Sequence, residues 1–201
     1  MIYWDWESAS SRTLPAIYAP TGQPLYWADR GALTGPKWPL TADDVDVQPS
    51  LAIPDFATFG GTATQKKPVP AAFTGAHATV HDNFDPGDMA DLQYSPRDPV
   101  FYAHHSNIDR LWSSWVAAGH TNPNFAQAKV YFYDETRTWR YVLMNDLKDE
   151  SQLGYKYSTL MQPAAPVKTL QTFALDSRGT SSFWRPPAWP PLGRRPAGHT
   201  S

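Results

Sequence analysis

Apolar residues recur at steps of three and four between residues 98 and 119, the spacing of an amphipathic helix. Asp98 and Pro99 are typical of a helix N-cap and first helical position, and Gly119 is typical of a C-cap. One face of this helix is apolar except for a single histidine, and it consists of Phe101, His105, Ile108, Leu111, Trp112 and Trp115. The pattern predicts that this face, and His105 with it, points inward.

A second, shorter helix is predicted from about Phe73 to Asp82. Before it, residues 1 to about 70 contain nine prolines, which prevent any long helix. These residues are therefore expected to form long loops.

Residues 129–143 are rich in aromatic and β-branched side chains and predict two strands joined by a turn at Asp134-Glu135. A further short element is expected over residues 153–157. The predicted fold class is therefore mainly α, with long loops and a small β element.

The 201 residues are enough for one domain with a sizeable core and a tail. Proline and glycine become frequent after about Gln162, which predicts a domain over residues 1–162 and a C-terminal extension over residues 163–201. The net charge of −2 favours neither nucleic acid nor an anionic membrane as a partner. No stretch of about 18 apolar residues and no signal-peptide pattern are visible, so the sequence predicts no membrane span and assigns no compartment.

Candidate chemistry comes from the histidines, because the chain has no cysteine and thus no thiolate ligand or nucleophile. His77 and His81 are four residues apart, which places both rings on one helix face where they could chelate one ion. The alternative roles for these two residues are those of a helix-capping histidine and of a surface histidine without a ligand. A zinc protease carries Glu after the first histidine, where this chain has Ala78. Imidazole ligands suit copper, zinc, iron or nickel.

His104 and His105 lie about 100° apart on one helix, so one should face the metal and the other a polar partner. The predicted inward face selects His105 as the ligand. Asp109, one turn later, is expected to orient a ligand ring or a nearby backbone group; the alternative is an ion pair with Arg110 or another basic group. His120 and His199 lack the sequence context of a ligand.

The run from Asp98 to Asp109, Asp-Pro-Val-Phe-Tyr-Ala-His-His-Ser-Asn-Ile-Asp, resembles the second copper-binding segment (copper B) of tyrosinases, catechol oxidases and polyphenol oxidases, the type-3 copper family. Arg110-Leu111-Trp112 continues the match. Other segments of residues 1–160 also resemble that family, including Tyr3-Trp4-Asp5-Trp6, Tyr131-Phe132-Tyr133-Asp134-Glu135 and the Tyr-x-Tyr pattern of residues 153–157. The resemblance implies a partial type-3 copper helical bundle.

By this resemblance His77, His81 and His105 are the three copper ligands, with Asp109, Phe101 and Leu92 around the metal or its entrance. Leu92 stands where relatives place a bulky residue above copper A; the alternative is a packed loop leucine. A complete family site holds two coppers, and the copper-A histidines would precede Met1. The chain is therefore expected to be the C-terminal half of a catalytic domain, and a fragment, a misplaced start and a true truncation stay open as explanations.

The resemblance implies a copper oxidoreductase that converts o-diphenols to o-quinones with dioxygen, and that this chain alone is inactive. Many relatives have Glu four residues before the first copper-B histidine and some have Asn after it, whereas this chain has Phe73 and Ala78. That difference favours diphenol oxidation over monophenol hydroxylation. Two alternatives stay open: a dioxygen-binding protein of the hemocyanin kind, and a catalytically dead remnant.

Overall fold

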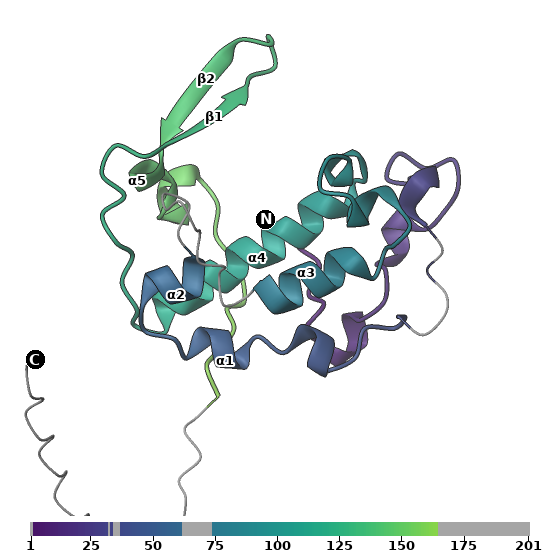
Figure 1. Cartoon of the computed structure of the whole chain (residues 1–201), viewed down its shortest axis with the longest axis horizontal. Helices are drawn as coiled ribbons and strands as arrows, with labels where there is room; N and C mark the ends of the chain where they lie inside the picture. Colours follow the sequence, from purple (N-terminus) through teal and green to yellow (C-terminus); the bar gives the residue numbers. More distant parts are fainter. Residues whose placement is uncertain (1, 32, 34–36, 62–73, 165–201) are drawn as a thin grey trace, which may run out of the picture. The chain divides into compact units, whose positions relative to one another are not determined.

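The computed structural model describes residues 2–31, 33, 37–61 and 74–164, which are mostly helical with one small two-stranded sheet. Figure 1 shows its helices and strands, which are α1 Gln48–Leu51, α2 Phe56–Gly60, α3 Thr74–Asp82, α4 Val100–Ala117, β1 Lys129–Tyr133, β2 Trp139–Leu143 and α5 Met144–Leu147. Short 3-10 turns occur at Ala9–Ser11, Ala16–Tyr18, Ala28–Arg30, Asp43–Val45, Asp88–Ala90, Ser95–Arg97 and Glu150–Leu153. The predicted fold class is confirmed. Most of the predicted C-terminal extension, residues 163–201, lies outside the described residues.

The longest helix, α4, begins and ends within two residues of its predicted limits. The Asp98 carboxylate accepts a hydrogen bond from the Val100 N–H at 3.0 Å and so satisfies one free donor of the first turn. After Ala117 the chain passes through Gly119, whose φ of 98° favours glycine. Neither α4 nor any other helix in the described ranges has the length and apolar character needed to cross a membrane.

The buried face of α4 matches the predicted face only in part: Leu111 and Trp115 are fully buried, and the other four predicted residues are not. Its buried residues are Val100, Ala103, His104, Asn107, Arg110, Leu111, Ser114 and Trp115. His105 is only partly buried, and so are Phe101, Ile108 and Trp112. The prediction that His105 lies on the inward face is therefore only partly right, because the fully buried histidine of the pair is His104. The cause is that polar residues of α4 are buried with hydrogen-bond partners, which a search for apolar periodicity does not register.

Residues 3–7, here called the N-terminal strap, supply most of those partners. The backbone N–H of Trp4 donates to the Ala103 carbonyl at 3.0 Å. The strap also supplies a carboxylate to Arg110 from Asp5, at 2.8 Å, and a second one from Glu7. The strap therefore covers the face of α4 that carries its buried polar residues.

A buried ion pair joins the loop region to the start of α4. Arg30 and Asp98 are 5% and 0% exposed, and two nitrogens of the guanidinium each lie 2.7 Å from a carboxylate oxygen. Arg30 also donates to the backbone carbonyls of Tyr18 and Leu25. A bidentate pair with these extra bonds satisfies both charges away from water.

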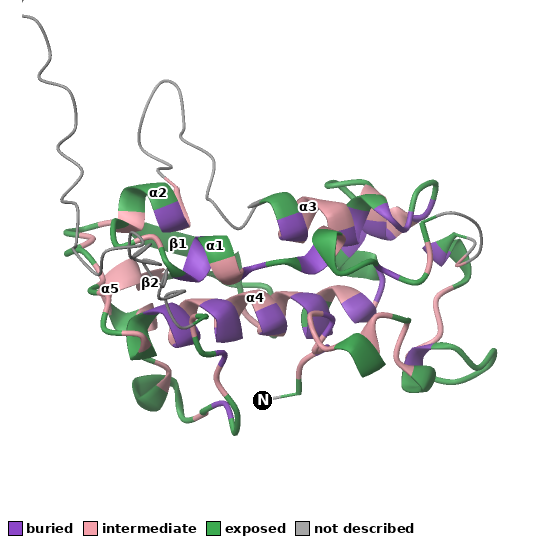
Figure 2. Cartoon of the chain, turned by 90° about the horizontal axis from the view of Figure 1, so that it is seen from below, coloured by how far each residue is buried: buried purple, intermediate pink, exposed green. Residues whose placement is uncertain are grey.

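The core around α4 is built mainly from aromatic and aliphatic side chains. Its largest fully buried members are Trp4, Trp6, Trp115, Phe59, Phe84, Leu40, Leu51, Met89 and Leu111. Figure 2 shows buried positions along the length of α4 and on α1, α2 and α3. These contacts hold α3 and α4 beside each other.

Strands β1 and β2 form an antiparallel hairpin in which Tyr131 faces Tyr141. The Asp134 carboxylate holds its turn by accepting hydrogen bonds from the backbone of Thr136 and Thr138. The predicted strands and turn are confirmed. The short element expected over residues 153–157 is absent except at its first residue: a 3-10 turn ends at Leu153, and the chain is irregular after it.

Candidate metal centre

Four histidine side chains from two helices meet in one cluster. His77 and His81 come from α3, and His104 and His105 come from α4. One candidate ligand nitrogen from each ring lies within 4.8 Å of the others. The four-residue spacing on α3 and the adjacent pair on α4 therefore converge.

The tautomer of His81 is fixed by the backbone. Its Nδ1 lies 2.7 Å from the Met89 carbonyl oxygen, which only accepts hydrogen bonds, so Nδ1 carries the proton. The His81 Nε2 lone pair is then free and lies 3.2 Å from Nε2 of His105. Without metal, the His105 Nε2–H donates to that lone pair. A metal ion held by both rings would take the place of this proton.

The tautomer of His104 is also fixed by a hydrogen bond, but the opposite ring nitrogen is protonated. Its ring is fully buried, and its Nδ1 lies 3.0 Å from Nε1 of Trp6. An indole N–H only donates, so Nδ1 is the acceptor, and a neutral His104 carries its proton on Nε2. That Nε2 is buried and has no hydrogen-bond partner among the described residues. Neither nitrogen of His104 therefore offers a free lone pair.

His77 stacks on His104, with ring centroids 5.3 Å apart and planes at 7°. Its Nε2 is buried without a hydrogen-bond partner in the described part of the chain. Buried polar atoms are rarely left unpaired, and an imidazole nitrogen in this state is suited to a metal ion.

Burial keeps the cluster uncharged. Burial, and then the charge of neighbouring histidines, lowers the pKa of His77 and of His105 from 6.5 to about 4. Burial also lowers the pKa of His81, and it lowers that of His104 well below the ordinary value. All four rings are therefore neutral at pH 7, as metal ligation requires. Nitrogen spacing, neutral rings and an unpaired buried nitrogen together fit a metal ion.

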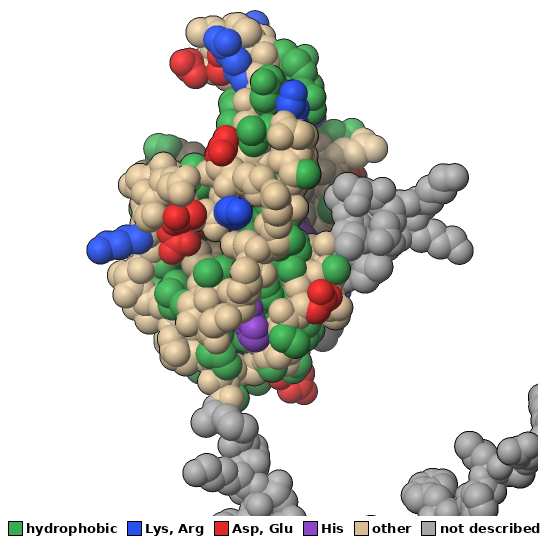
Figure 3. Space-filling model, turned by 90° about the vertical axis from the view of Figure 1, so that its left-hand side faces the viewer, with side chains coloured by type: hydrophobic (Ala, Val, Ile, Leu, Met, Phe, Trp, Pro, Cys, Tyr) green, Lys and Arg blue, Asp and Glu red, His purple; other side chains and the backbone are tan. Residues whose placement is uncertain are grey.

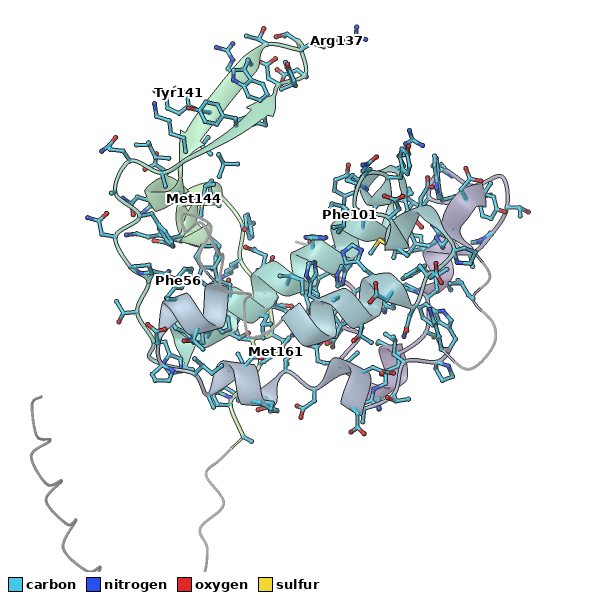
Figure 4. The ribbon with its side chains drawn as sticks, viewed as in Figure 1. Phe56, Phe101, Arg137, Tyr141, Met144 and Met161 are labelled. Carbon is cyan, nitrogen blue, oxygen red and sulfur yellow. The ribbon has the colours of Figure 1, made fainter. Side chains whose placement is uncertain are left out.

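Two of the three residues predicted around the metal have distinct environments. Phe101 packs on His105 with ring centroids 4.0 Å apart and lies 6.0 Å from the ring of His81; Figure 4 shows it on α4. Leu92 is 85% exposed, so the alternative of a packed loop leucine is wrong. Its role as a gate stays a prediction.

Asp109 was expected to orient a ligand ring or a nearby backbone group, but its carboxylate binds two tyrosines instead. Its Oδ2 accepts hydrogen bonds from the hydroxyls of Tyr155 at 2.7 Å and Tyr157 at 2.6 Å. Burial and the Asp109 carboxylate raise the pKa of both tyrosines. The alternative, an ion pair of Asp109 with Arg110, is also wrong, because Arg110 pairs with Asp5 and Glu7. Asp109 thus anchors the Tyr-x-Tyr segment to α4.

The sequence did not predict Trp6 or Met89 as parts of the site. Met89 acts through its backbone carbonyl, which no side-chain pattern reveals. Trp6 is 98 residues from His104 in sequence. His120 is bound elsewhere, with Nε2 3.0 Å from the Leu51 carbonyl oxygen. His199 lies outside the described residues.

Comparison with known proteins places this site in a family. Residues 34–118 match the family model "Common central domain of tyrosinase", and residues 120–166 match "Polyphenol oxidase middle domain". The chain belongs to the tyrosinase and polyphenol oxidase family.

Curated relatives include the chloroplastic polyphenol oxidase of Vitis vinifera, which is 27% identical over 83% of this chain and 33% of the relative. The latent form of the chloroplastic polyphenol oxidase of Prunus armeniaca is 30% identical over 80% of this chain and 33% of the relative. The chain therefore spans about a third of the length of these relatives.

Solved structures in the same family share the fold. Latent apple tyrosinase matches with a TM-score of 0.60 and 28% identity, over 79% of this chain and 42% of that one. The polyphenol oxidase of Grenache grape, Vitis vinifera, matches with a TM-score of 0.56 and 25% identity, over 79% of this chain and 57% of that one.

Proposed function

We propose that His77, His81 and His105 hold one copper ion, and that this chain is the copper-B half of a polyphenol oxidase that oxidises o-diphenols to o-quinones with dioxygen. The observation that carries the proposal is the convergence of imidazole nitrogens within 4.8 Å of one another between α3 and α4. Membership of the tyrosinase family supports copper among the metals that accept imidazole ligands.

Hydrogen bonding in the cluster supports three ligands in place of four. His81 has a free Nε2 lone pair because Met89 binds its Nδ1–H. His105 can move its own proton to Nδ1 and so release Nε2 for the metal. His104 cannot do so while Trp6 donates to its Nδ1.

The other residues of the site orient the ligands and limit access. The Met89 carbonyl sets the rotation of His81, and Phe101 restricts the ring of His105 by packing against it. His77 and His105 are only partly buried, so one side of the cluster is reachable from outside. Copper, when bound, supplies electron transfer between a phenol and dioxygen; the protein supplies positioning and shielding.

The substrate preference and the inactivity of the isolated chain are parts of the same proposal. Ala78 on α3 replaces the Asn that some relatives carry beside the first copper-B histidine, and Phe73, which lies outside the described residues, replaces Glu. These replacements favour o-diphenols over monophenols as substrates. One three-histidine cluster supports one copper, so the chain alone is not expected to turn over a diphenol.

The test is oxygen uptake by the copper-loaded 201-residue chain in the presence of catechol, beside metal analysis of the same sample. The expected result is about one copper per chain, with oxygen uptake no faster than that of the His105→Ala variant. A chain that takes up no copper contradicts the metal assignment. Rapid, copper-dependent turnover by a monomeric chain contradicts the half-site.

A further inference from the structure

Trp6 has an unusual position for a residue so far from the ligand helices in sequence. Its indole ring is fully buried, tilted by 41° against the His104 ring, with centroids 5.9 Å apart. Its Nε1–H donates to His104 Nδ1 at 3.0 Å. Neighbouring strap residues hold Trp6 in place: the backbone N–H of Trp4 donates to the Ala103 carbonyl, and Asp5 pairs with Arg110.

We propose that Trp6 is a positioning residue of the metal centre, which locks His104 as the Nε2–H tautomer and thereby keeps His104 out of the ligand set. The lock follows from chemistry: an indole N–H has no acceptor capacity, and a neutral imidazole has one N–H and one lone pair. With the lone pair used by Trp6, His104 brings to the cluster only a hydrogen-bond donor.

The inference extends the proposed function, because it rests on three other histidines as ligands. It explains how a cluster of four converging rings selects three. His104 is the most deeply buried of the four, so burial alone would favour it as a ligand. The hydrogen bond from Trp6 opposes that preference. It also leaves a buried Nε2–H that is available to a polar group bound at the centre.

The direct test is the tautomer of His104 in the metal-free 201-residue chain at neutral pH. Nitrogen-15 NMR of the histidine rings, assigned through a uniformly labelled sample, distinguishes Nδ1–H from Nε2–H. The expected result is a single Nε2–H tautomer for His104 and Nδ1–H for His81. A wild-type His104 protonated on Nδ1 overturns the proposal, and this measurement needs no variant.

Two matched variants separate the lock from general packing. Trp6→Phe removes the donor to His104, and Trp4→Phe removes a second buried indole, whose Nε1–H donates to the Ser11 carbonyl at 2.7 Å. Trp6→Phe is expected to give a mixture of His104 tautomers, whereas Trp4→Phe keeps one. An unchanged single tautomer in a folded Trp6→Phe variant, or equal effects of both variants, contradicts the lock.

Zinc, which gives sharp NMR signals, serves as the metal probe. In the wild-type chain, His104 should keep its Nε2–H when zinc is added while His77, His81 and His105 shift. Loss of the His104 proton on zinc binding overturns the inference. A chain that binds no zinc or copper defeats the proposed function, yet the tautomer of His104 in the metal-free chain still tests the lock.

Discussion

The helical region that carries the histidines and the hairpin both contain aromatic side chains. The helical region buries them, whereas the hairpin exposes them. In the helical region Trp6 and Trp115 are fully buried, whereas Trp139 and Tyr133 on the hairpin are 56% and 67% exposed. Figure 3 shows apolar side chains on the surface of the hairpin. Aromatic content therefore does not distinguish the two regions. What distinguishes them is that the helical region also buries polar groups with defined partners.

The ion pairs of the two regions show the same contrast. Arg30 and Asp98 are 5% and 0% exposed, whereas Arg140 and Asp134 on the hairpin are 59% and 15% exposed. A buried charge depends on its partner, because water cannot replace the partner. An exposed charge loses little, because water can. The helical region should thus be sensitive to single changes that the hairpin tolerates.

The largest expected effect comes from Arg30→Ala. The substitution leaves the Asp98 carboxylate buried and unpaired, which costs about 3–5 kcal/mol of unfolding free energy. Urea unfolding followed by circular dichroism measures this cost. The matched control is Arg140→Ala, for which we expect a far smaller loss. Equal losses in the two variants would remove the contrast between the regions.

A smaller difference is expected between two tryptophans. Trp115 donates from Nε1 to the Ile53 carbonyl at 2.6 Å and stacks on Phe59, with centroids 4.7 Å apart. Trp115→Phe leaves that carbonyl without its partner and should cost about 1–3 kcal/mol. Trp139→Phe should change stability by no more than about 0.5 kcal/mol. Thermal unfolding of both variants checks the order, and a larger loss at Trp139 would reverse it.

Acid should act on the two regions in separate pH windows. The pKa of His77 and His105 falls from 6.5 to about 4 on folding, so between these pH values the unfolded chain binds more protons. Stability of the metal-free chain is therefore complete above pH 6.5 and declines as the pH falls toward 4. Hydrogen bonds from Thr136 and Arg140 lower the pKa of Asp134 from 3.8 to about 2, so its contribution is lost only as the pH falls from 3.8 toward 2.

Urea unfolding of the metal-free chain across this pH range measures the first window. The second is measured by circular dichroism from the stacked Tyr131 and Trp139 rings, whose centroids lie 5.5 Å apart. A hairpin signal that fades already between pH 6.5 and 4 while the helical region stays folded would contradict the assignment of the windows.

Local signals in the sequence predicted α3, α4 and the hairpin, whereas the three proposed ligands stay a prediction. Asp98 and Gly119 mark the ends of α4 because capping depends on nearby residues. The buried face of α4 was predicted only in part, and the partner of Asp109 was predicted wrongly. Both depend on contacts between residues 46 to 105 positions apart, such as Asp109 with Tyr155 and Arg110 with Asp5. Periodicity contains no information on such contacts.

The histidine cluster likewise combines a local feature that the sequence contains and a distant contact that it does not. The spacing of His77 and His81 reports that both lie on one helix face, and this local geometry is present in α3. His104 differs from His105 because Trp6 donates a hydrogen bond to its Nδ1. No sequence spacing relates Trp6 to the residues of α4. Both the predicted inward face and the resemblance to the copper-B segment selected His105, and the hydrogen bond from Trp6 to His104 supports that prediction.

Copper content of two alanine variants tests the assignment of His105, and not His104, as the third ligand. His104→Ala and His105→Ala remove neighbouring rings from the same helix, and each variant is loaded with copper, freed of excess metal and analysed beside the wild-type chain. We expect that the folded His104→Ala variant retains about one copper per chain, whereas His105→Ala loses it. Equal loss in both, or copper retained only by His105→Ala, would contradict the assignment of His77, His81 and His105 as the ligands.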